Sequence, residues 1–165
     1  MTSKLSIREM CLLALMAALM VASQVAMAAL PNIHLVAVFI IVTTLAFGWK
    51  AMLSVAVFVA LEGVIFGFGI WWISYLYVWP ALVAVVMIFR ENDSSLLWAI
   101  IAGAHGLLFG AMCAVPYLFI GGWEMAVSYW VAGIPFDLVH CAGNFVVTLL
   151  LAKPLTKLTQ RYIGK

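Results

Sequence analysis

Residues 133–152 read GIPFDLVHCAGNFVVTLLLA, an apolar run that carries three strongly polar side chains, Asp137, His140 and Asn144. These residues are spaced by three and then four positions, so on an α-helix they lie on one face. Ionisable groups inside an apolar membrane span are costly unless they are paired or hydrated, and such a face therefore marks a candidate functional site. The alternative is that the three side chains form hydrogen bonds that hold neighbouring helices together.

The rest of the chain is as apolar as this run. Of its 165 residues, 68% are apolar and 8% are charged, whereas soluble domains contain about half apolar and a quarter charged residues. We therefore expect an all-α integral membrane protein, a compact bundle of six transmembrane helices that forms one domain over residues 1–165. The longest connection is expected at about residues 117–133. The predicted helices cover approximately residues 10–30, 33–49, 51–69, 70–90, 95–116 and 134–152.

The positive charges predict how the bundle is oriented. With six crossings, all eight Lys and Arg residues fall on one side of the membrane, and the loops on the opposite side contain none. Because cytoplasmic loops carry the excess of Lys and Arg, both termini are expected in the cytoplasm. The positive residues are Lys4, Arg8, Lys50, Arg90, Lys153, Lys157, Arg161 and Lys165.

The first predicted helix carries a ridge of small side chains. Ala14, Ala18 and Ala22 recur at intervals of four, which places their methyl groups in a nearly straight line along the helix. Ridges of this kind let another helix approach closely. The partner is either another helix of this bundle or a separate membrane subunit.

Further polar residues lie within the other predicted helices, toward the external side. Glu62 lies in the third helix and His105 in the fifth, while Asp137, His140 and Asn144 begin the sixth helix from outside. A buried carboxylate is usually paired, so we expect Glu62 to contact His140 or His105.

Aromatic residues gather on the same side of the predicted bundle. Trp71, Trp72, Tyr75 and Trp79 lie at the outer mouth of the fourth helix, and Trp123 and Trp130 lie in the external segment before the sixth. Such residues anchor many proteins at the membrane surface. Together with a few polar groups they also suit a pocket for a planar or bulky organic ligand, and we expect a substrate site here.

Several functions find no support in the sequence. There is no G-x-x-x-x-G-K-[ST] phosphate loop for ATP hydrolysis. The three cysteines lack the spacing of a metal or disulfide framework, so neither a metal nor a cofactor is expected. Nucleic-acid binding is not expected either, because the positive charges are those that membrane topology requires.

The chain resembles the substrate-binding S components of energy-coupling factor (ECF) transporters over essentially its whole length. The similarity lies in six short helices, the alanine ridge, and a last helix of pattern G-x-P-F-D-x-x-H-x-x-x-N that ends in PLTKLTQR. The resemblance implies a non-catalytic subunit of a bacterial cell membrane that captures a vitamin or a metal ion from outside. It also implies that Ala14, Ala18 and Ala22 dock on a membrane-embedded T component, with two cytoplasmic ATPases supplying the energy.

The resemblance leaves the substrate open. Metal-transporting members begin with a His-containing segment, which this chain lacks. The aromatic, weakly charged outer surface favours cobalamin, as in the cobalamin-type S components of lactobacilli, and folate, pantothenate, riboflavin and queuosine-type compounds remain alternatives. Two other classes also stay open: a small intramembrane enzyme that uses Glu62, Asp137 and His140, and a structural subunit without a ligand.

Overall fold

The computed structural model describes residues 5–29 and 33–163, which are helical almost throughout and contain no strand. The predicted all-α fold is therefore confirmed for this part of the chain. The elements are α1 (Ile7–Ala26), α2 (Val36–Phe47), the short 3-10 helix η1 (Gly48–Lys50), α3 (Ala51–Phe66), α4 (Ile70–Ile88), α5 (Ser95–Cys113) and α6 (Val115–Ile163).

Five helical stretches among the described residues are long and apolar enough to cross a membrane. One of them, Val36–Phe66, contains α2, η1 and α3. The other four are α1, α4, α5 and α6. The sequence-based prediction of several membrane-crossing helices is thus confirmed. The bounds of the first five expected helices differ from the observed ones by a few residues, whereas α6 is much longer than the expected helix over residues 134–152.

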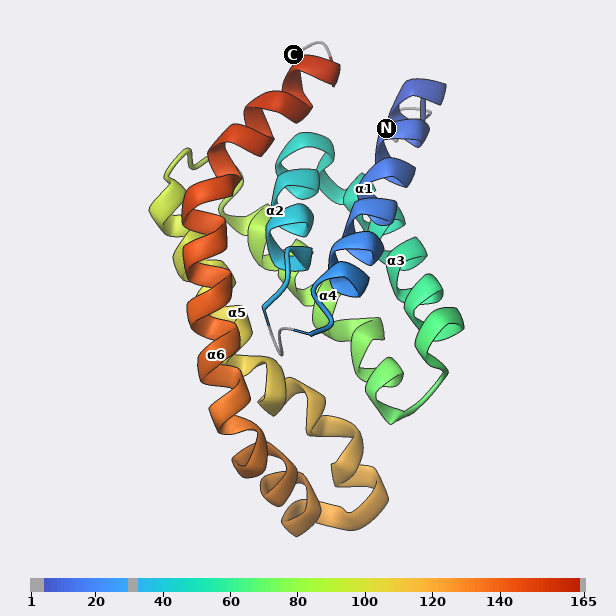
Figure 1. Cartoon of the computed structure of the whole chain (residues 1–165), viewed down its shortest axis with the longest axis vertical. Coiled ribbons are helices and arrows are strands. Elements are labelled where there is room, and N and C mark those ends of the chain that lie inside the picture. Colours follow the sequence, from blue (N-terminus) through green and yellow to red (C-terminus); the bar gives the residue numbers. More distant parts are fainter. Residues whose placement is uncertain (1–4, 30–32, 164–165) are drawn as a thin grey trace.

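Helix α2 forms the centre of the bundle (Figure 1). It contacts α1, α3, α4, α5 and α6, and every one of its residues except Leu45 is buried. A helix that is apolar on all sides needs such an environment. With 12 residues it is only about 18 Å long, shorter than the expected helix over residues 33–49.

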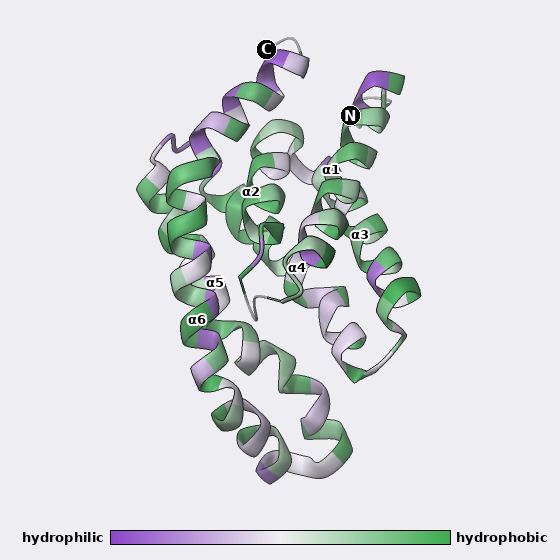
Figure 2. Ribbon diagram, in the orientation of Figure 1, coloured by the Kyte–Doolittle hydropathy of each residue, from purple (hydrophilic) through white to green (hydrophobic). Residues whose placement is uncertain are grey.

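The beginning of α1 and the end of α6 lie at the same end of the molecule (Figure 1). Hydrophilic residues gather there (Figure 2), and we call it the basic end. Here Ser6 caps α1 in a reciprocal pair of hydrogen bonds with Glu9, and Glu9 also forms a 2.7 Å ion pair with Lys50. This ion pair and the Ser54 hydroxyl, which donates to the Leu13 carbonyl at 2.8 Å, fasten α1 to the α2–α3 hairpin.

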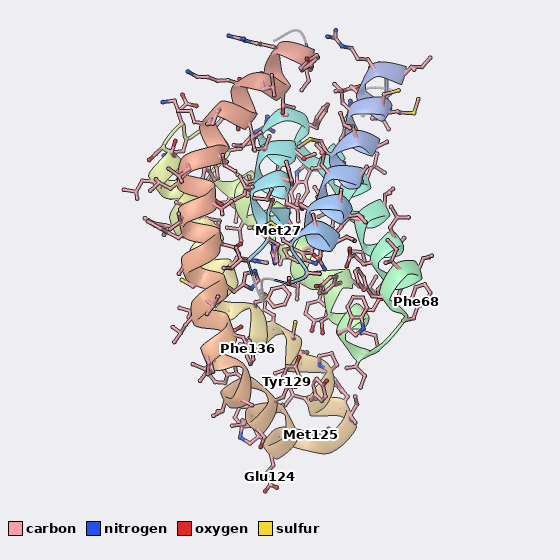
Figure 3. The ribbon with its side chains drawn as sticks, in the orientation of Figure 1. Met27, Phe68, Glu124, Met125, Tyr129 and Phe136 are labelled. Carbon is pink, nitrogen blue, oxygen red and sulfur yellow. The ribbon has the colours of Figure 1, made fainter. Side chains whose placement is uncertain are left out.

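The segment expected as a long connection, about residues 117–133, is helical instead. Only Gly122, with φ 76° and ψ −170°, leaves helical geometry, and the chain reverses there to form a helical hairpin (Figure 1). We call residues 115–133 the end hairpin. Its arms are joined by stacking of Tyr117 on Tyr129, with ring centroids 4.3 Å apart, while Glu124 points away from the bundle (Figure 3).

Candidate functional site

The three polar residues of α6 lie on its buried face, as their spacing predicts. This face packs against a glycine-rich side of α5. A Cβ atom added to Gly106 would lie 2.9 Å from the backbone nitrogen of Cys141 and from the carbonyl group of His140. Glycine at this position therefore allows the two helices to approach closely enough to enclose the polar face.

Two of these residues bind the backbone of α5. The amide of Gly110 donates to Asp137 Oδ1 at 2.9 Å, and Asn144 Nδ2 donates to the carbonyl of Ala102 at 3.3 Å. In each side chain, one polar atom therefore holds α6 against α5. The remaining polar atoms, Asp137 Oδ2 and Asn144 Oδ1, are buried without a hydrogen-bond partner among the described residues.

Three imidazole rings gather at the middle of the bundle around Trp79 and Phe109. The His140 ring centroid lies 4.7 Å from that of His34 and 4.8 Å from that of Phe109. Trp79 lies 5.4 Å from His105 and 5.9 Å from His34. His105 Nε2 is 3.1 Å from the Val78 carbonyl oxygen, whereas neither nitrogen of His140 has a partner within the described chain.

Sequence reasoning missed His34. It falls at the start of the predicted helix over residues 33–49, whereas in the structure it lies in the short segment before α2. The available signal was that an imidazole stands near one end of an otherwise apolar run.

Glu62 is buried, but its partner differs from the one expected. Gln24 Nε2 donates to Glu62 Oε2 at 2.7 Å and lies 3.5 Å from the Tyr75 hydroxyl. Glu62 Oε1 has no partner among the described residues, so the expected hydrogen bond to His140 or His105 is wrong. The amide at the end of α1 is closer than either imidazole.

A pocket of about 290 Å³ opens beside this pair. Tyr75 separates it from the imidazole rings, since its ring centroid lies 5.1 Å from that of Trp71 and 5.5 Å from that of Trp79. The pocket and the imidazole cluster are thus adjoining parts of one polar and aromatic region. The pocket is lined by Gln24, Ala28, Glu62, Phe66, Trp71 and Tyr75.

The other predicted aromatic residues are placed differently. Trp72 Nε1 donates to the Val59 carbonyl at 2.8 Å and so joins α4 to α3. Trp123 and Trp130 line a second pocket, of about 200 Å³, between α5 and the end hairpin. The structure therefore brings Trp71, Tyr75 and Trp79 to the polar region, and leaves Trp123 and Trp130 outside the Glu62 pocket.

Ala14, Ala18 and Ala22 are exposed on α1. The buried face of this helix consists of Leu13, Met16, Ala17 and Met20. The alanine ridge therefore does not pack against the described residues of its own bundle.

The buried polar atoms of the region share one property, the absence of a hydrogen-bond partner among the described residues. Such atoms are uncommon because each costs free energy, and they call for an explanation such as a polar ligand or bound water. No group of three or more His, Cys, Asp and Glu side chains in the described ranges is arranged to hold a metal ion. The atoms are Gln24 Oε1, His34 Nδ1, Glu62 Oε1, Trp79 Nε1, His105 Nδ1, Asp137 Oδ2, His140 Nδ1 and Nε2, and Asn144 Oδ1.

Fold and site together define an all-helical protein with membrane-spanning character and a polar, aromatic region within its bundle. No family model matches the chain, and comparison with curated proteins and with solved structures finds no match for it either.

Proposed function

We propose that this protein is the substrate-binding membrane subunit of an ECF-type transporter and that it captures a vitamin. The observation that carries the proposal is the set of buried polar atoms without partners beside Trp71, Tyr75 and Trp79. A ligand with several polar groups and a flat apolar body would supply hydrogen bonds and ring contacts to this region at once. Each such bond would remove the cost of a buried, unsatisfied group.

The proposal includes six membrane crossings with both ends in the cytoplasm. It is supported by the common position of the two ends of the described chain (Figure 1) and by the eight Lys and Arg residues of the sequence. In this orientation the Glu62 pocket lies in the outer half of the bundle, because α1 and α3 both run away from the basic end.

The proposed partners are a membrane-embedded T component and two cytoplasmic ATPases. The exposed ridge of Ala14, Ala18 and Ala22 supports docking of a helix from outside the bundle, since small side chains allow close approach. The sequence has no phosphate loop of its own, and ATP hydrolysis would belong to the partner subunits.

Cobalamin is the first substrate to test, but the size of the Glu62 pocket favours a smaller vitamin. The pocket volume of about 290 Å³ is near the lower limit of the range of about 300–1,000 Å³ for small-molecule sites. A corrinoid would require the pocket to widen toward the imidazole cluster. Smaller vitamins such as pantothenate or riboflavin would need less rearrangement.

A catalytic role has less support from the geometry. Glu62 binds Gln24 and Asp137 binds the Gly110 amide, so these carboxylates and His140 do not form the mutual hydrogen bonds of a nucleophile and its base.

The test is calorimetric binding of cobalamin, cobinamide, folate, pantothenate and riboflavin to the detergent-purified protein. We expect saturable binding of one vitamin class, weakened by Glu62→Leu and unchanged by the surface control Glu124→Leu. Absence of saturable binding across the whole panel would contradict the proposal.

A further inference from the structure

A pocket of about 310 Å³ lies at the basic end, between the α4–α5 turn and the last part of α6. Its lining includes three cationic side chains, Arg90, Lys153 and Lys157, and one carboxylate, Asp93. It shares no lining residue with the Glu62 pocket, which is lined by residues of α1, α3 and α4 and of the segment after α1. Because positive charge exceeds negative charge around a concave surface, the pocket favours an anion.

The cations of this pocket are weakly neutralised by the protein. Lys153 and Lys157 form no ion pair among the described residues, and Arg90 pairs with the exposed Glu91 at 3.5 Å. An exposed pair of this kind contributes little. The two lysines are four positions apart on α6, where like charges repel each other, and an anion between them would remove that repulsion.

The pocket also contains a hydroxyl group without a partner. Thr43, Thr44 and Thr159 each donate to the carbonyl four residues earlier, at 2.6, 2.7 and 2.9 Å. Thr156 lines the pocket, and its Oγ1 is shielded from solvent without a hydrogen-bond partner in the described chain. A change of the χ1 rotamer of Thr156 would turn this hydroxyl toward an acceptor in the pocket.

The opposite wall is the beginning of α5, where Ser95 lines the pocket. Ser94 caps this 19-residue helix by accepting a hydrogen bond from the Leu97 amide. The positive end of the helix dipole thus faces the same space as the lysines and attracts an anionic group.

Apolar side chains at the neighbouring helix ends indicate that the anion belongs to a lipid. Ile88, Phe89 and Leu96 are exposed beside the α4–α5 turn, and Leu150 is exposed on α6 just before Lys153. At the ends of apolar helices, cations lie at the height of lipid phosphates and the preceding apolar side chains lie at the height of the acyl chains.

We propose that this pocket binds the phosphate group of an anionic phospholipid, such as phosphatidylglycerol. Lys153 and Lys157 attract the phosphate, the Thr156 hydroxyl donates to one of its oxygens, and Trp98 closes the inner wall. The lipid would join the α4–α5 turn to α6 at the membrane surface. The proposal requires a membrane protein and does not depend on vitamin transport.

The experiment is native mass spectrometry of the detergent-purified full chain with dioleoylphosphatidylglycerol and, in parallel, dioleoylphosphatidylcholine. We expect one tightly bound phosphatidylglycerol and weaker phosphatidylcholine binding. The double variant Lys153→Gln/Lys157→Gln should bind phosphatidylglycerol about tenfold or more weakly, because it removes two cations that line the pocket, and a cation close to a lipid phosphate contributes about 1 kcal/mol. The control Arg8→Gln/Arg161→Gln removes the same charge outside the pocket and should bind as the unaltered protein does.

A second pair of variants keeps the test valid if the double variant does not fold. Thr156→Val should weaken phosphatidylglycerol binding several-fold, and Thr159→Val, whose hydroxyl is already bonded within α6, should not. Equal binding of the two lipids, or equal losses in the two double variants, would overturn the proposal. So would displacement of the lipid by an equal concentration of inorganic phosphate, which would identify a free-anion site.

Discussion

His140 shows at the scale of one residue how stability and function oppose each other in this bundle. Its side chain is fully buried, and both ring nitrogens lack hydrogen-bond partners among the described residues. We expect His140→Leu to raise the stability of the detergent-purified protein by about 1–3 kcal/mol, because a buried unsatisfied polar group is removed. If the imidazole serves the ligand, the same change should abolish vitamin binding.

The control for this prediction is Thr148→Val on the same helix. Thr148 is also buried, with an unpartnered hydroxyl, so its replacement should raise the melting temperature and leave vitamin binding unchanged. Thermal unfolding and calorimetry on the two variants separate the effects. Intact binding by His140→Leu would remove His140 from the site.

At the residue scale the sequence predicts faces better than partners. The spacing of Asp137, His140 and Asn144 places them on one face, because helical periodicity depends only on the chain nearby. The partner of Glu62 is instead Gln24, 38 positions earlier in the last turn of α1. Contacts between distant residues depend on helix tilt and on the position of the segment that contains His34, and the local spacing of polar residues predicts neither of these.

At the scale of elements, α5 and α6 depend on glycine at their contact. We expect Gly106→Ala to destabilise the protein by about 1–3 kcal/mol, since overpacking a tight interface forces the backbones apart. The matched control is Gly133→Ala, where an added Cβ atom meets nothing within 4 Å. That variant should gain up to about 1 kcal/mol from helix propensity. Thermal unfolding of both variants tests this, and equal shifts would contradict it.

The alanine ridge allows a second prediction about elements. We expect Ala18→Trp to block uptake in cells and to prevent co-purification with a T component, while vitamin binding stays nearly unchanged. Ala18 is exposed, so the larger side chain affects only the approach of an outside helix. Leu19→Trp is the control, because Leu19 is exposed and its side chain leaves α1 about 100° around the helix axis from that of Ala18. Retention of the partner by Ala18→Trp would count against docking through this ridge.

The end hairpin is the element that could not be predicted from the sequence. The sequence predicts a connection over about residues 117–133, between the apolar runs 95–116 and 134–152. In the structure these residues continue as helix on either side of Gly122. Stacking of Tyr117 on Tyr129 joins the two arms, and it can be predicted only if the reversal of the chain at Gly122 is already known.

For the whole molecule, the length of the last helix limits how the bundle can lie in a membrane. Residues 123–163 continue beyond Gly122 without another break in helical geometry and extend for about 60 Å, whereas the hydrocarbon core is about 30 Å thick. The helix must therefore project from the membrane. Lys153, Lys157 and Arg161 keep its final part in water, and we expect the end hairpin, with Glu124 at its tip (Figure 3), to project on the other side.

Cysteine labelling tests this arrangement in living cells. With Cys11, Cys113 and Cys141 replaced by alanine, Glu124→Cys should react with a membrane-impermeant maleimide in intact cells. Glu91→Cys at the α4–α5 turn is the matched control, since both glutamates are exposed. It should react only after permeabilisation, as should Arg8→Cys, because both positions lie at the basic end. Labelling of Arg8→Cys and Glu91→Cys from opposite sides would overturn the six-crossing arrangement, and a complete reversal of the pattern would overturn its orientation.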